Sequence, residues 1–186
     1  MEGRSAVQLL TGNPWPELFG QCQRGAFHLE VKDTYAVANE SEPLRRFLDG
    51  EPDDNAWFEP WGELVRETTR RGVQVTRVRV ITVPHVDYQR WLLTLTALNI
   101  AAGEDIRYLP RHQVSGGQVP ADDFWLLDDE RVVFNLVDMN GRAAGASALT
   151  TDSRIAELCR TVQQNLWPLA TPYRHYVAGR AADTQG

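Results

Sequence analysis

Lysine, cysteine and long apolar runs are scarce in this chain of 186 residues, and each scarcity excludes a kind of site. Lys32 is the only lysine among the 19 lysine and arginine residues, so no other position offers a nucleophilic amine. Cys22 and Cys159 are far apart and lack CxxC spacing, which is typical of reduced thiols. No run approaches the roughly 18 apolar residues of a membrane-spanning helix, and the first residues lack a signal-peptide core. We therefore expect a cytoplasmic protein that does not enter a membrane.

The motifs of common enzyme classes are also missing. The chain has no GxxxxGK[ST] phosphate loop, no GxGxxG dinucleotide turn and no GxSxG nucleophile elbow. The histidines are scattered singly, as His28, His85, His112 and His175. A metal site would therefore have to be assembled by folding, and we expect neither a metal nor a cofactor.

The composition is that of an ordinary globular domain, with 42% hydrophobic and 24% charged residues. A net charge of −6 and a pI near 5.2 disfavour direct binding to nucleic acid or to an anionic membrane. The preference for arginine over lysine, with abundant Ala, Val and Asp, indicates a high-GC, actinobacterial genome. We expect one α/β domain over residues 14–176, between a flexible N-terminus (1–13) and a flexible tail (177–186).

Apolar periodicity predicts a series of helices and strands. Helices are expected at 14–22, 40–49, 57–71, 85–102 and 152–167. Strands are expected at 26–31, 73–82, 106–109, 124–127, 131–138 and 142–149. Asn140-Gly141 is a two-residue hairpin signal between the last two strands. This order predicts a mixed β-sheet flanked by helices.

The strand expected at 73–82 carries an unusual charge. Arg77 and Arg79 are two residues apart, so their side chains leave the same face of a strand that is otherwise apolar. Buried guanidinium groups need partners, and the best candidates are Glu104 and Asp105, where the expected helix gives way to the next strand. Two interpretations stay open. The charges form a buried ion-pair network that fixes the sheet, or they line a pocket for a carboxylate or phosphate.

Ligands of open α/β sheets gather at the carboxyl ends of parallel strands, which here adjoin the start of the helix at 85–102. The candidate ligand-binding residues are therefore Arg77, Arg79, His85, Asp87, Tyr88, Trp91, Glu104, Asp105, Arg107 and Arg111. We assign no catalytic residue. The acidic turn at 128–130 could bind a cation, but hairpin turns favour aspartate for backbone reasons alone.

Three stretches of the chain resemble a known family: VTRVRVITVPHVDYQRWLL, NIAAGEDIRYLPR and DDFWLLDDERVVFNLVDMNGR. They are similar to a widespread actinobacterial family described as a domain of unknown function, family 6879. The resemblance runs from about Phe27 to Tyr173. Members of this family often lie beside helix-turn-helix regulators or in biosynthetic clusters. The resemblance implies a regulatory or accessory role with such a partner protein.

The order of elements is also similar to half of a phospholipase-D-like domain. In that domain a strand ends near an aspartate and is followed by a turn, another strand and a closing helix. When the aspartate is placed on Asp129, Asp122 and Phe124 take the positions of the catalytic histidine and lysine. The resemblance therefore implies a degenerate version of the fold without phosphodiesterase chemistry.

The function we expect is that of a non-catalytic regulatory or accessory binding module. It would act with a partner protein and bind a small anionic ligand at the arginines. The alternative is a small enzyme of specialised metabolism that uses Arg77, Arg79 and Glu104 to orient an anionic substrate.

Overall fold

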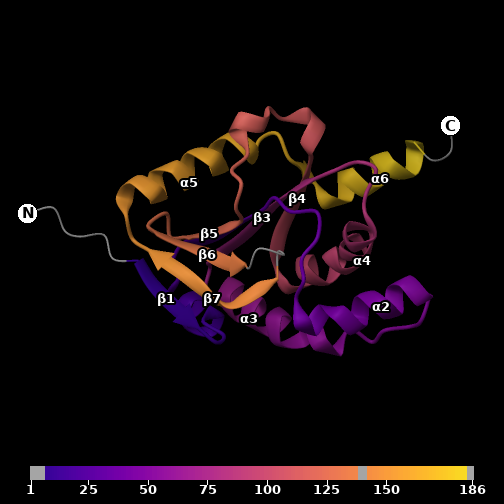
Figure 1. Cartoon of the computed structure of the whole chain (residues 1–186), viewed down its shortest axis with the longest axis horizontal. Helices are drawn as coiled ribbons and strands as arrows, with labels where there is room; N and C mark the ends of the chain where they lie inside the picture. The colour runs from indigo at the N-terminus through magenta and orange to yellow at the C-terminus, as the bar shows by residue number, and fades with distance from the viewer. Residues whose placement is uncertain (1–6, 138–141, 184–186) are drawn as a thin grey trace, which may run out of the picture.

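The computed structural model describes residues 7–137 and 142–183, and these form one eight-stranded mixed sheet with helices on both faces (Figure 1). The strand order is β1-β7-β6-β5-β2-β3-β4-β8. The strands are β1 (Val7–Thr11), β2 (Gly25–Glu30), β3 (Gln74–Ile81), β4 (Glu104–Pro110), β5 (Phe124–Leu127), β6 (Arg131–Val137), β7 (Ala143–Thr150) and β8 (Thr171–Pro172). The prediction of an α/β fold built on a mixed sheet is confirmed.

Strand β2 lies at the centre of the sheet, where parallel and antiparallel pairing meet. It runs parallel to β3 and antiparallel to β5, and β3 runs parallel to β4. In the β2–β3 register His28 lies opposite Arg77, and Glu30 lies opposite Arg79. Side chains alternate along each strand, so these four residues share one face of the sheet.

Six helices cover the sheet within the described part of the chain. They are α1 (Trp15–Gln21), α2 (Ser41–Asp49), α3 (Glu59–Arg70), α4 (Asp87–Ala102), α5 (Ser153–Leu166) and α6 (Tyr173–Asp183). Helix α5 lies on one face, while α3 and α4 lie on the other with α2 outside them (Figure 1). The α5 face is apolar and includes Phe27, Leu29 and Val78. Ala26, Val75 and Trp125 belong to the core on the α1–α3 side.

The structure corrects the predicted ends of the domain. Residues 7–11, which we expected to lack regular structure, form β1 and pair antiparallel with β7. Residues 173–183, most of which we assigned to the flexible tail, form α6. Tyr173 and Tyr176 pack this helix against the sheet beside Tyr108. The predicted Asn140-Gly141 hairpin turn lies outside the described residues.

The other predicted elements agree with the structure to within a few residues. Strand β4 is longer than the expected 106–109, because Glu104 and Asp105 already pair with β3. Helices of the described residues are all too short or too polar to cross a membrane.

Candidate functional site

A pocket of about 580 Å³ opens on the face of the sheet that α3 and α4 cover, a size within the usual range of ligand pockets. Its floor is formed by four side chains of β2 and β3, namely His28, Glu30, Arg77 and Arg79. Its walls are rich in aromatic side chains, which are Trp15, Tyr35, Trp57, Phe58, Trp61, Tyr88 and Trp125. This combination of apolar walls and a few convergent polar groups is typical of a binding site.

Glu30 connects the two arginines of the floor. Its Oε1 accepts a hydrogen bond from Arg77 Nη1 at 2.6 Å, and its Oε2 accepts one from Arg79 Nε at 2.5 Å. Arg77 and Arg79 are only 7% and 4% exposed. Burial alone would raise the pKa of the Glu30 carboxyl, but the two guanidinium groups hold that pKa well below its usual range. All three groups are therefore charged at neutral pH.

Glu104 of β4 supports the floor of the pocket from beneath. Its Oε2 lies 2.9 Å from Arg77 Nη2, and its Oε1 accepts hydrogen bonds from Trp61 Nε1 and Asn99 Nδ2, both at 2.8 Å. The Glu104 side chain has no exposed surface. Both carboxylate oxygens are engaged, so Glu104 fixes α3, α4 and β3 to one another.

Arg79 extends the network towards α4 and the far edge of the sheet. Its Nη1 donates to Thr96 Oγ1 at 3.0 Å and to the Tyr108 hydroxyl at 2.9 Å. The ring of Tyr108 stacks on Tyr176 of α6, whose hydroxyl lies 2.8 Å from Nε2 of His85. A continuous set of contacts therefore joins the pocket floor to α6.

His28 is the polar residue of the floor that lacks a partner. Its ring stacks on Trp125, with centroids 4.2 Å apart, and is 7% exposed. Burial and the charge of Arg77 lower the pKa of His28 to about 3, so the imidazole is neutral. Nδ1 lies 3.5 Å from Glu30 Oε1, yet neither ring nitrogen makes a hydrogen bond to the described residues. A buried polar group without a partner is unfavourable, and a ligand in the pocket could supply one.

Two further carboxyl groups line the pocket, and neither pairs with a basic residue in the described part of the chain. Asp123 accepts a hydrogen bond from the backbone N–H of Val31 at 2.7 Å, and burial raises the pKa of its carboxyl to about 6. Glu40 accepts a hydrogen bond from the hydroxyl of Tyr88, and burial raises the pKa of Glu40 as well. Both carboxyl groups therefore ionise less readily than exposed ones.

The structure brings only some of the predicted site residues together. Arg77, Arg79 and Tyr88 line the pocket, and Glu104 lies directly beneath it. Trp91 lies behind the wall and stacks on Trp57, with ring centroids 5.6 Å apart. The two interpretations of the arginines are compatible, because the buried ion-pair network also forms the floor of a pocket.

The remaining predicted residues, His85, Asp87, Asp105, Arg107 and Arg111, do not line the pocket. His85 contacts α6, and Asp87 pairs with Arg90 at the surface. Asp105 and Arg107 pair with each other, and Arg107 lies over the ring of Trp167 next to α5. Arg111 donates to the backbone carbonyls of Val31 and Val80. None of these five positions contributes to the pocket, and a ligand-binding role for them stays a prediction.

Sequence reasoning missed His28, Glu30, Glu40 and Asp123. For His28 and Glu30 a signal existed, because both alternate with Phe27 and Leu29 in a strand that we expected. The prediction gave the strand at 26–31 but assigned no role to its polar residues. No comparable pattern identifies Glu40 or Asp123. Glu40 ends a short 3-10 turn, and Asp123 lies just before β5.

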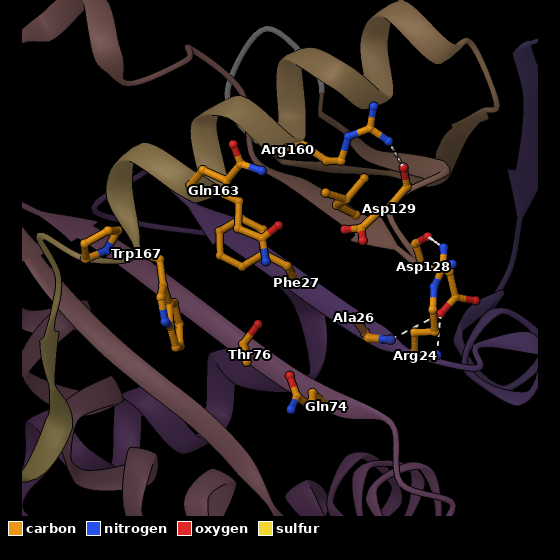
Figure 2. Close-up of a pocket in the computed structure, with 14 residues that line it drawn as sticks. Arg24, Ala26, Phe27, Gln74, Thr76, Asp128, Asp129, Arg160, Gln163 and Trp167 are labelled. Atoms are coloured by element: carbon orange, nitrogen blue, oxygen red, sulfur yellow. Dashed lines mark hydrogen bonds between the residues drawn. The ribbon is translucent and has the colours of Figure 1, made fainter.

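A second pocket, of about 510 Å³, lies on the opposite face between α5 and strands β2 and β3 (Figure 2). Figure 2 shows Trp167 at one end, Thr76 and Gln74 along the sheet, and Arg24 at the other end. Its arginines have partners, since Arg24 pairs with Glu130, and Arg160 binds Glu157 and the carbonyl of Asp129. None of the buried, unpartnered side chains found among the described residues lines it.

The acidic turn beside this second pocket has a backbone role. Asp128 and Asp129 adopt left-handed conformations, with φ of 53° and 63°. The Asp128 carboxylate accepts hydrogen bonds from the backbone N–H groups of Gln23, Arg24 and Gly25. The described residues contain no group of three or more His, Cys, Asp or Glu side chains that could hold a metal. The pocket above Arg77 and Arg79 is therefore the stronger candidate.

Both cysteine thiols are held in their protonated form. Cys22 donates its thiol hydrogen to the carbonyl of Gly25 or to Asp128. Burial raises the pKa of both Cys22 and Cys159 to about 11. Thiols with such pKa values are protonated at neutral pH and react slowly.

The fold resembles that of phospholipase D family members. Nuc from Salmonella typhimurium, a phospholipase D family member, superposes with a TM-score of 0.53 at 9% identity, covering 91% of this chain and 99% of Nuc. NucT from Helicobacter pylori gives 0.51 at 9% identity, again with 91% and 99% covered. At such identities the likeness shows the fold alone. The predicted phospholipase-D-like arrangement is confirmed at that level.

The archaeal chromatin protein TrmBL2 also has a similar fold, with a TM-score of 0.51 at 15% identity. The match covers 92% of this chain and 55% of TrmBL2, so the chain spans about half the length of that protein. Among functionally curated proteins, none matches the chain. A family pattern matches residues 13–178, which include the pocket and nearly all of the sheet. The chain therefore belongs to the family described as a domain of unknown function, DUF6879.

Proposed function

We propose that this chain is a non-catalytic binding module that takes a small organic ligand into the pocket above Arg77 and Arg79. The observation that carries the proposal is His28, a buried imidazole in the pocket floor with no hydrogen-bond partner among the described residues. Ligand binding is favourable in a pocket of this kind, because the ligand can satisfy the polar group and pack against the aromatic walls.

The rigidity of the floor supports binding over catalysis. Arg77 and Arg79 are held in place by Glu30 and Glu104, so they need not reorganise when a ligand enters. The enzyme alternative assigned Glu104 a part in orienting substrate. Glu104 has no exposed surface, and both of its oxygens are engaged, so it is unsuited to that part.

One observation favours an enzyme as the second candidate. Asp123 lines the same pocket, and its carboxyl has a pKa of about 6, close to that of an effective general base. In that case Asp123→Asn would abolish turnover. The binding proposal requires no turnover.

The family resemblance extends the proposal to a biological setting. The module would work in the actinobacterial cytoplasm as a regulatory or accessory component, beside a helix-turn-helix regulator or a biosynthetic partner protein. The acidic net charge of −6 supports a protein or small-molecule partner over direct contact with nucleic acid.

Titration with tryptophol, a neutral indole alcohol, tests the pocket by two-dimensional NMR. We expect saturable shifts of the indole N–H signals of Trp57 and Trp61, which line the pocket. Val37→Trp places a bulky ring at a half-buried lining position and should abolish the shifts. Val7→Trp is the matched control, because Val7 is 66% exposed on β1 away from the pocket. Shifts that persist in Val37→Trp would overturn the proposal.

A further inference from the structure

We infer that the ligand of this pocket is a small organic cation, with an ammonium or alkylated ammonium group on a flat or apolar body. This inference rests on the proposed function and names the ligand class for the same pocket. It replaces the anionic ligand that the two arginines suggest in the sequence.

The arginines of the floor are not available to an anion. The Arg77 guanidinium is bound by Glu30 and Glu104, and it also lies over the rings of Trp61 and Trp125, at 5.9 and 5.6 Å from their centroids. Arg79 binds Glu30 and two hydroxyl groups. An anionic ligand would have to displace carboxylates that are already buried and correctly placed, which is costly.

The charges around the pocket favour a cation. Glu30 and Glu104 offset the two guanidinium groups, while Glu40 and Asp123 form no ion pair in the described part of the chain and interact with Arg77, Arg79 and Lys32 only at longer range. An ammonium group in the pocket would supply the missing counter-charge. Because the site is partly withdrawn from water, that attraction is stronger than at an exposed surface.

The aromatic wall next to Glu40 suits a cation as well. Tyr88, whose hydroxyl donates to Glu40, lies 5.8 Å from Tyr35 between ring centroids. Trp57 lines the same pocket and is braced from behind by Trp91. Aromatic rings that converge beside a carboxylate attract ammonium groups through their negatively polarised faces.

His28 adds an acceptor for the same kind of ligand. A neutral imidazole carries one N–H donor and one acceptor nitrogen. In His28 neither nitrogen has a partner in the described residues, and the low pKa of about 3 means that the ring does not become a competing cation. Because both nitrogens are buried, a local shift of the ring would let the acceptor nitrogen receive a hydrogen bond from an ammonium or other N–H group.

Three indoles of matched size test the inference by calorimetry at pH 7.5: tryptamine (cationic), tryptophol (neutral) and indole-3-propionate (anionic). We expect tryptamine to bind at least about tenfold more tightly than tryptophol, and indole-3-propionate to bind most weakly. Equal affinities, or a preference for the propionate, would overturn the inference and leave the proposed binding function intact. If none of the three binds, the proposed function fails, and the inference fails with it.

Removal of the unpaired carboxyl groups tests the cause of the preference. The double variant Glu40→Gln, Asp123→Asn should bring the affinity for tryptamine close to that for tryptophol. Glu42→Gln and Asp122→Asn are matched controls, since their carboxylates are 63% and 72% exposed and pair with Arg45 and Lys32. An unchanged preference in the double variant, or a lost preference in the controls, would contradict the assignment.

Proton release gives a measurement that needs no variant. Asp123 faces Tyr35, Glu30 and Lys32, and Glu40 faces Tyr88, Glu30 and the two arginines. A bound cation favours the ionised form of both carboxyl groups. Tryptamine binding at pH 6 should therefore release protons, seen as a dependence of the binding heat on the ionisation enthalpy of the buffer. Proton uptake, or no exchange, would overturn the inference.

Discussion

The carboxylate of Glu104 lies 2.9 Å from Nη2 of Arg77, between two parallel strands and out of contact with water. Trp61 and Asn99 occupy the other oxygen of this carboxylate, so the pair is closed on all sides. The charge of Arg77 is thereby neutralised by partners inside the protein. Arginines whose sequence pattern predicts anion binding can thus have a structural role beneath a site for a different ligand.

Glu104→Ala should lower the free energy of unfolding by roughly 3–5 kcal/mol, because it leaves the Arg77 charge buried with one partner fewer. Urea unfolding followed by tryptophan fluorescence measures the loss. The matched control is Glu63→Ala, since Glu63 is 57% exposed and pairs with Arg66 at 3.0 Å on the surface of α3. That control should cost about 1 kcal/mol or less. Similar losses for the two variants would contradict a buried network.

Arg79 should not be replaceable even by lysine. Its guanidinium binds Glu30, Thr96 and Tyr108 from different directions, and an ammonium group cannot reproduce that fork. We expect both Arg79→Ala and Arg79→Lys to lower the midpoint of thermal unfolding, the alanine variant by the larger amount. The network would not be structural if Arg79→Ala unfolded at the wild-type temperature.

Asp123 should make the protein less stable as the pH rises from about 4 to about 6. Burial raises the pKa of Asp123 from 3.8 to about 6, so the folded state holds this proton more tightly than the unfolded state. Unfolding then becomes easier as the proton is lost, by at most about 3 kcal/mol. Asp123→Asn should remove this decline and gain stability at pH 7.

The comparison with the variant is needed because His28 acts in the opposite direction. The pKa of His28 is lowered to about 3, so its contribution to stability is lost as the pH falls below about 6.5. Urea midpoints of the wild type and Asp123→Asn from pH 4 to 7.5 separate the two effects. Parallel curves for the two proteins would show that Asp123 has an ordinary pKa.

Tyr176 should hold α6 through its ring more than through its hydroxyl. The ring stacks on Tyr108 at 4.8 Å with an interplanar angle of 10°, and the hydroxyl interacts with His85 and Arg180. Tyr176→Ala should increase hydrogen exchange throughout α6 and cost roughly 1–3 kcal/mol, whereas Tyr176→Phe should cost about 1 kcal/mol or less. Equal exchange in α6 for both variants would contradict this assignment.

Much of the fold could be predicted because apolar periodicity is a local property. The helix at 87–102 and the strands around Arg77 and Phe124 follow from spacing alone. Strand β1 could not be found in this way, because it lies at an edge and its side chains are almost all exposed. It has no buried face to impose an alternation.

The candidate site could be predicted only where charge stood inside an apolar strand. Arg77 and Arg79 were found on that basis, and Glu104 was found as a candidate partner for their buried guanidinium groups. Glu30 was missed because its role depends on β2 lying beside β3, and strand order is a property of the whole fold. Glu40 and Asp123 reach the pocket from segments outside the sheet, and only the packing of those segments decides where their carboxyl groups lie.

The central position of β2 has a mechanical consequence. Among the described strands, β2 alone links the parallel strands β3 and β4 to the antiparallel strands that begin with β5. Glu30 of β2 forms ion pairs with both arginines of β3, while His28 of β2 stacks on Trp125 of β5. A force that pulls the two halves of the sheet apart must therefore break the contacts of β2 with β3 or those of β2 with β5. A ligand bound above His28 and Glu30 would add contacts across this junction and stabilise the sheet.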